Sequence, residues 1–191
     1  NPVTGKPVQK FQPVTNFLDQ FKEKFDSERI SFFVARKQGV SQSLILEQWA
    51  NKGKVATTLG TAVHKWIEDY YNGLEPEPHP DPRVMDRINK FRDIYESRLH
   101  KLTSVKQEFR LFSRKWNIAG TTDIIFKLLP DYYVGDWKTN EKFTTDENPN
   151  PKAPNKKLKY PFEDLNENSL NLYSIQLSLY RLILQEEAGF E

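Results

Sequence analysis

The segment from Ser104 to Lys138 constrains the fold of this chain more than any other part of the sequence. β-branched and aromatic residues are concentrated in it, and polar, turn-forming stretches interrupt them. This pattern is typical of β-strands joined by short turns. The sequence therefore predicts three strands in antiparallel succession, at about residues 105–112, 116–126 and 132–138.

A turn at Leu128-Leu129-Pro130-Asp131, centred between positions 129 and 130, would join the second and third strands. If these strands pair symmetrically about that centre, Asp123 directly faces Asp136. Like charges in this arrangement destabilise a sheet unless a cation or a proton lies between them. A divalent metal ion would meet this requirement.

Strand alternation places Lys138 on the same face as Asp136 and puts Trp137 on the other face. In the same register Lys138 lies opposite Thr121, close to the predicted position of Asp123. Two carboxylates and one lysine are thus expected at a single site.

Glu108 is a further acidic candidate, on the first of the three strands. If Ser113 to Trp116 forms the turn after that strand, Glu108 faces Thr121 and becomes a diagonal neighbour of Asp123.

This group of residues suits metal-assisted hydrolysis of a phosphodiester. Mg²⁺ uses one or two carboxylates, keeps several waters and takes a further ligand from the phosphate. The metal lowers the pKa of a bound water and polarises the phosphate. Lys138 would orient or help deprotonate that water, or stabilise charge on the phosphate oxygens. The alternative is that Asp136 and Lys138 are surface charges of a half-exposed hairpin.

Helices are predicted on both sides of the strand segment. Residues 1–16 are expected to form an extended N-terminal arm, and residues 17–191 a single domain. Apolar periodicity predicts helices that begin near residues 16, 44, 60, 84 and 170. The third is expected to end at Asn72-Gly73, and the last to bury a stripe of Leu172, Ile175, Leu179, Leu182 and Ile183.

Composition excludes several classes of site. The chain has no cysteine, so it holds no disulfide, no thiolate zinc site, no cysteine nucleophile and no cysteine-bound iron–sulfur cluster. Its longest apolar runs fall far short of the roughly 20 residues of a membrane-spanning helix, so no membrane partner is expected.

The net charge of +2 supplies little of the positive field that marks dedicated nucleic-acid-binding proteins. A DNA partner would therefore need local basic patches. The densest lies in the polar segment 139–168, which is too long for an ordinary connection. This patch consists of Lys152, Lys156, Lys157 and Lys159. These lysines could equally well be solvated side chains of a loop or contacts to DNA phosphates.

Four short motifs occur in a specific order along the chain. They are Gly60-Thr61-Ala62-Val63-His64, Gly120-Thr121-Thr122-Asp123, Gly135-Asp136-Trp137-Lys138-Thr139 and Gln176-Leu177-Ser178-Leu179-Tyr180. This ordered set resembles the RecB-like branch of the PD-(D/E)XK nucleases, which includes the AddB nuclease domain and phage and mitochondrial exonucleases. Each motif alone is weak, whereas the four in order, with a β-pattern between them, are specific.

The resemblance implies a restriction-endonuclease-like α/β core, with a mixed central sheet whose antiparallel three-strand section is flanked by helices. It implies a nuclease that depends on Mg²⁺ or Mn²⁺ and acts on DNA ends or single strands, more as an exonuclease than an endonuclease. A role in DNA repair or recombination follows, in the cytoplasm of a bacterial or phage-infected cell, with an organelle as the alternative. The family fold has a further strand after the last motif, expected beyond residue 191.

The resemblance also assigns roles to residues. The catalytic residues would be Asp123, Asp136 and Lys138. Metal ligands would be His64, Asp123, Asp136, the backbone carbonyl of Trp137 and, from its register, Glu108. DNA contacts or support would come from Gln176, Tyr180, Tyr173 and Thr139, besides the four lysines.

Three other functions remain open from sequence. A DNA-binding module could keep this scaffold without catalysis, and a related hydrolase could act on a smaller phosphoester. The third is a protein-interaction domain in which the motifs are accidental.

Overall fold

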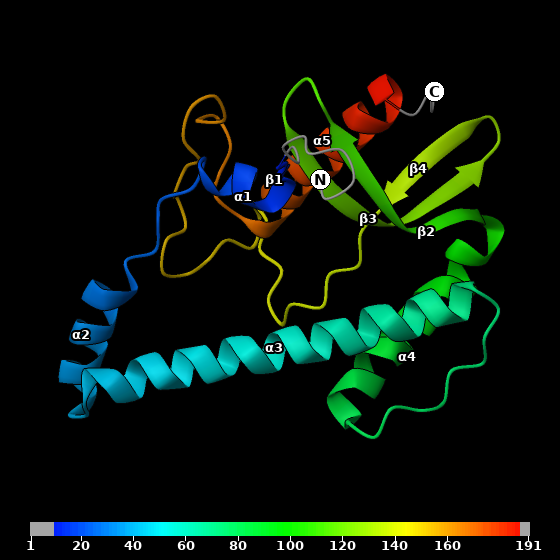
Figure 1. Ribbon diagram of the computed structural model, residues 1–191. Helices are drawn as coiled ribbons and strands as arrows, with labels where there is room; N and C mark the ends of the chain where they lie inside the picture. The colour runs from blue at the N-terminus through cyan, green and yellow to red at the C-terminus, as the bar shows by residue number, and fades with distance from the viewer. Residues whose placement is uncertain (1–9, 188–191) are drawn as a thin grey trace, which may run out of the picture. The chain divides into compact units, whose positions relative to one another are not determined.

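The computed structural model describes residues 10–187 and shows a mixed α/β protein with a mixed sheet and flanking helices (Figure 1). The described chain divides into two compact units. The first contains residues 10–23, Lys101–Asp136 and 143–187, and the second contains Lys24–His100 and Trp137–Lys142. Each unit is described by itself below, and a single domain over residues 17–191 stays a prediction.

The sheet of the first unit is built around one long strand. Strand β3 (Ile118–Leu128) pairs antiparallel with β2 (Thr103–Ser113) and with β4 (Asp131–Gly135). It also pairs over two residues, in parallel, with β1 (Gln12–Pro13). The three predicted antiparallel strands are confirmed, and the short parallel strand makes the sheet mixed.

Part of the predicted N-terminal arm is regular structure. Residues 1–9 lie outside the described chain, but β1 and the start of α1 (Val14–Asp19) fall within the predicted arm. Val14 and Leu18 are buried in the core of the first unit, which explains why the chain forms a helix there. The prediction of an extended arm up to residue 16 is therefore wrong for its last residues.

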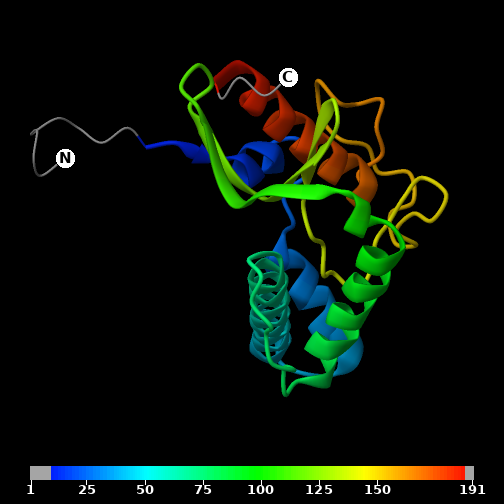
Figure 2. The same cartoon turned by 90° about the vertical axis from the view of Figure 1, so that its right-hand side faces the viewer.

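Helix α5 (Ser169–Glu187) lies along the sheet in both views (Figures 1 and 2). Its existence and bounds match the prediction, but its buried face is centred on Gln176, Tyr180 and Ile183. Leu182, which was predicted in the buried stripe, is 37% exposed. The predicted stripe is confirmed at Ile183, and Ile175 and Leu179 pack against the core. The stripe omitted the centre of the buried face because a glutamine and a tyrosine occupy it.

The second unit is helical. Its helices are α2 (Ser27–Gln38), α3 (Gln42–Tyr71) and α4 (Pro82–Ser97), and a short 3-10 helix, η1 (Leu99–Lys101), follows. Its core brings α3 and α4 together through Val63, Ile67, Val84, Ile88 and Phe91. The predicted helix near residue 84 is confirmed.

Helix α3 corrects the sequence prediction of two helices, near residues 44 and 60. It is one helix of 30 residues, which begins after the capping side chain of Ser41 and ends before Asn72-Gly73 as predicted. The intervening Gly53 costs a helix only about 1 kcal/mol, and no proline interrupts the segment. The absence of an apolar stripe around Gly53 was therefore no reason to end the helix there.

Helix α2 was not predicted. It buries only Ser31 and Ala35, so it has no apolar stripe to find. Its ends are nevertheless marked locally, because Asp26 caps the first turn and Gly39 adopts a left-handed backbone after the last.

Within the described part of the chain, residues 139–168 contain turns and one isolated bridge, Lys157 to Asn166, but no helix or longer strand. This agrees with the predicted long polar segment. None of the described helices combines the length and apolar character needed to cross a membrane.

The face that α5 buries can be tested with neighbouring residues. Ile183→Ala removes a side chain that is 1% exposed and should lower the free energy of unfolding by about 2–5 kcal/mol. Leu182→Ala, the matched control, should cost well under 1 kcal/mol because Leu182 is partly exposed. Urea unfolding measures both, and equal losses would contradict the observed face.

Candidate metal centre

The predicted pairing of the second hairpin is confirmed. The observed pairs run from Leu128↔Asp131 to Ile124↔Gly135, in the predicted register. The ladder ends at Gly135, so Asp136 lies directly after its last pair, and Asp123 directly precedes Ile124. The predicted direct pairing of Asp123 with Asp136 is not among the observed pairs, because Asp136 lies beyond the end of β4.

The third predicted strand is too long, because β4 ends at Gly135 and not at residue 138. The predicted position of Lys138 opposite Thr121 does not form, since no ladder continues past Gly135. The reason is Trp137, whose ring packs with Tyr71 and Phe91 in the core of the second unit. Burial of this indole outweighs further pairing in the sheet.

Glu108 occupies a different register position from the one predicted. The pairs Gln107↔Ile124 and Phe109↔Thr122 leave Glu108 and Asp123 opposite each other on β2 and β3. The prediction placed Glu108 opposite Thr121, two residues away, because it put the preceding turn too early. Ser113 pairs with Ile118, so the turn residues are 114–117.

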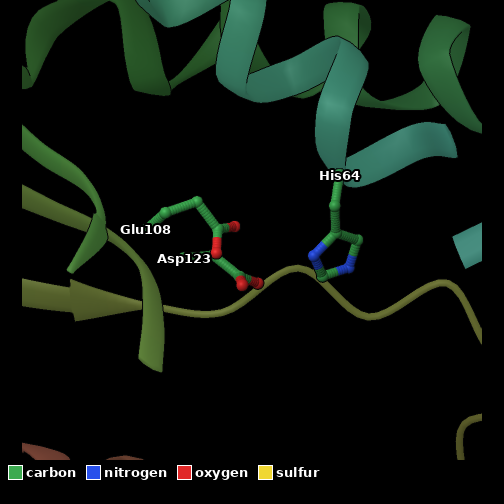
Figure 3. Close-up of side chains that lie close together, drawn as sticks. All are labelled: His64, Glu108 and Asp123. Atoms are coloured by element: carbon green, nitrogen blue, oxygen red, sulfur yellow. The ribbon is translucent and has the colours of Figure 1, made fainter. Parts of the chain in front are cut away.

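The carboxylates of Glu108 and Asp123 are directed toward each other, as Figure 3 shows, and each offers an oxygen within 4.8 Å of the other's. Glu108 is exposed and Asp123 is half-buried. Glu108 also has a left-handed backbone, with φ of 46°, in the middle of a strand. Non-glycine residues rarely adopt this conformation, and it is concentrated at functional sites.

Asp136 is held from α5. Gln176 Nε2 donates to Asp136 Oδ1 over 3.4 Å and to the Tyr180 hydroxyl over 3.0 Å. Gln176 and Tyr180 are only 6% and 3% exposed, so neither is a surface residue. Both instead support the carboxylate from inside the protein.

The charges of the two aspartates also affect the pKa of Tyr180. Burial raises the pKa of its phenol above the usual value, and the charges of Asp136 and Asp123 raise it further, while the hydrogen bond from Gln176 opposes this. Tyr180 therefore stays protonated beside these carboxylates at neutral pH.

Gly120 has a steric role in this arrangement. A Cβ atom at this position would lie 2.7 Å from Cε1 of Tyr180 and 2.9 Å from its hydroxyl oxygen. Only glycine lets the phenol ring lie against β3, which explains the first residue of the Gly120-Thr121-Thr122-Asp123 motif.

Thr122 is a supporting residue that the sequence did not single out. It is fully buried, and its hydroxyl donates to the Gly135 carbonyl over 2.9 Å. This bond fixes the end of β4 immediately before Asp136. The available signal was only its position between Gly120 and Asp123.

Four of the predicted site residues belong to the second unit. His64 lies on α3, half-buried, next to the core residue Val63. The others are Trp137, Lys138 and Thr139, of which Lys138 is exposed. The motif Asp136-Trp137-Lys138 thus passes from one unit to the other.

The four lysines of the polar segment differ in their surroundings. Lys156 Nζ lies 3.0 Å from Glu167 and 3.6 Å from Glu23, and Lys157 donates to the Asp164 carbonyl. These two lysines stabilise the segment itself. Lys152 and Lys159 are exposed.

Tyr173 lies beside Gln176 on α5. It packs against Phe143 and lines a hollow of about 290 Å³, together with Gln176 and Lys22. This places it next to the support of Asp136, with space for a ligand beside it.

Comparisons of the sequence with protein-family models and with curated proteins found no match.

The steric role of Gly120 gives a test of this geometry. Gly120→Ala should lower the free energy of unfolding by about 1–3 kcal/mol, because the new methyl group overlaps the Tyr180 ring. In a Tyr180→Leu background the same change should cost clearly less.

Gly53→Ala is the matched control, since nothing lies within 4 Å of its added Cβ. Inside helix α3 this change should be neutral or stabilising. Urea unfolding of all four variants decides the matter, and a cost of Gly120→Ala that is independent of residue 180 would contradict the proposed contact.

Proposed function

We propose that this protein is a metal-dependent nuclease that hydrolyses phosphodiester bonds of DNA on a restriction-endonuclease-like, RecB-like scaffold. The observation that carries the proposal is the opposition of Glu108 and Asp123 on adjacent strands. Two like charges at this separation destabilise a sheet, and the left-handed backbone at Glu108 adds conformational strain. Such a costly arrangement is best explained by a bound cation.

The donor set favours a hard divalent cation. Glu108 and Asp123 offer carboxylate oxygens. Asp136 follows directly on β4, whose last residue pairs with Ile124, the neighbour of Asp123. Oxygen donors suit Mg²⁺ and Mn²⁺. We propose His64 and the Trp137 carbonyl as further ligands on the resemblance of their motifs.

When bound, the metal would polarise a phosphate and acidify a water molecule. The residues around it would perform the remaining work. Gln176 and Tyr180 hold Asp136 in place, and Lys138 would orient the water or stabilise charge on the phosphate.

The resemblance of the four motifs is the ground for a nucleic-acid strand as the substrate. The hollow beside Gln176 offers an aromatic ring at Tyr173 on which a base could stack, but its cation, Lys22, is paired with Asp19, and Glu167 also lines it. Residues 139–168 offer further exposed lysines at positions 152 and 159. We therefore propose DNA ends or single strands as substrates, exonuclease action, and a place in repair or recombination in the cytoplasm of a bacterial or phage-infected cell.

Digestion of labelled DNA tests the proposal directly. We expect the wild-type protein to cleave linear oligonucleotides labelled at the 5′ or 3′ end in Mg²⁺ or Mn²⁺, and to lose all cleavage in a chelator. Circular single strands separate exonuclease from endonuclease action. Binding without cleavage in either metal would leave only a DNA-binding scaffold.

Isosteric variants identify the residues responsible. Glu108→Gln, Asp123→Asn and Asp136→Asn should abolish detectable cleavage, because each removes a charge but little volume. Lys138→Ala should lower kcat by on the order of 100-fold or more. Asp131→Asn is the control, since Asp131 is exposed and pairs with Leu128, at the far end of the β3–β4 ladder from Asp123; an equal loss in the control would contradict the assignment.

Metal binding should also be visible without a substrate. Mn²⁺ at about 100 times its Kd should stabilise the folded wild type by about 2.7 kcal/mol, because a ligand of the folded state shifts the unfolding equilibrium. The measurement is Tm against Mn²⁺ concentration. Asp131→Asn should respond as wild type does, whereas Glu108→Gln and Asp123→Asn should respond weakly; the same rise in all four proteins would place the ion elsewhere.

A further inference from the structure

The segment that carries Lys138 is fastened on both sides of that residue, within the second unit. On one side, the Trp137 ring stacks on Tyr71 at 6.3 Å and meets Phe91 edge-on at 5.3 Å. On the other side, Arg87 Nε of α4 donates to the Thr139 carbonyl over 3.1 Å. Lys138 itself is exposed, and the residues on either side of it hold its backbone.

The guanidinium of Arg87 is well placed to act as a fixed support. Nη1 donates to the Arg83 carbonyl one turn earlier on α4, over 2.8 Å, while Nε reaches the Thr139 carbonyl. Two bonds in different directions from one planar group leave it little rotational freedom. The bond to the Thr139 carbonyl is partly buried, which strengthens it relative to a fully exposed one.

Gly60 of α3 completes the fastening. A Cβ atom at this position would lie 3.1 Å from Oγ1 of Thr139, closer than ordinary van der Waals contact. The Thr139 side chain therefore lies against the α3 backbone at Gly60, and a larger residue there would require it to shift by a few tenths of an ångström. Beside this contact, Arg87, Lys138 and Thr139 line a hollow of about 410 Å³.

We propose that Arg87 is a positioning residue for the reaction: through the Thr139 carbonyl it fixes the Trp137–Asn140 backbone and hence the direction of Lys138. Its contact with the segment stands on the structure of the second unit alone, whereas its effect on cleavage rests on the proposed nuclease function. A displacement of about 1 Å in a positioned catalytic group can lower a rate on the order of 100-fold. Loss of Arg87 should therefore lower kcat and leave KM almost unchanged.

The first experiment measures, without any substrate, whether Arg87 restrains the segment around residue 138. Because the chain has no cysteine, Lys138→Cys creates a single thiol for a nitroxide spin label. Arg87→Met keeps the aliphatic stem and the helix propensity of arginine but removes every donor. We expect the label to become more mobile in Arg87→Met. It should stay as in the parent in Arg92→Met, an exposed residue of the same helix.

The second experiment is kinetic and uses the protein with Lys138 intact. Arg87→Met should lower kcat on the order of 10- to 100-fold with KM within about twofold. Arg87→Lys should recover part of the loss, because an ammonium can still donate to the Thr139 carbonyl. Arg92→Met should match wild type, and thermal melts confirm that each variant is folded; Arg87→Lys serves if Arg87→Met is not.

The outcomes separate the two hypotheses. A label that is equally mobile in Arg87→Met and Arg92→Met would overturn the fastening, whether or not the protein is a nuclease. A mobile label with unchanged kcat would overturn the positioning role. A wild-type protein that cleaves no DNA would instead overturn the proposed function, while the label still reports whether Arg87 fixes the segment.

Discussion

The pairing of β3 with every other strand is the constraint on which the first unit depends. β3 joins β1, β2 and β4 into one sheet, and within four residues it also carries three parts of the candidate site. Gly120 makes room for Tyr180, Thr122 holds the end of β4, and Asp123 faces Glu108. Fold and site therefore share the same residues, and the sheet cannot shift register without separating the carboxylates.

Stability and function oppose each other along this strand. An apolar pair at the Glu108 and Asp123 positions would stabilise the sheet more than two acidic residues do. The buried phenol and amide of Tyr180 and Gln176 likewise replace apolar side chains in the centre of the α5 interface. Gln176 donates to the Tyr180 hydroxyl and to Asp136 Oδ1. Burial of polar groups costs little only when they are paired in this way, so these residues act as a unit.

How far sequence could predict the site depended on the turns. Pro130 allows only one position for the β3–β4 turn, so the sequence predicted the pairing of β3 with β4 correctly. The β2–β3 turn, in contrast, contains no proline or glycine. That turn ends at Asn117, which has a left-handed backbone with φ of 54°, a conformation that asparagine tolerates better than most residues. Because no proline or glycine marks the β2–β3 turn, the sequence predicted this turn too early and assigned Glu108 to the wrong partner. Tertiary contacts decided the rest: Trp137 leaves the sheet for an aromatic core that no local pattern reveals.

The passage of the Asp136-Trp137-Lys138 motif between the two units sets a further physical limit. Asp136 takes its support from Gln176 and from the Thr122 bond to Gly135, all in the first unit. Lys138 is flanked by Trp137 and Thr139, both of which are fastened in the second. Two peptide units join the α-carbons of Asp136 and Lys138, which can therefore be at most about 7 Å apart. The chain itself thus limits how far these two α-carbons can separate, and the supports within each unit fix the backbone on the two sides of this link.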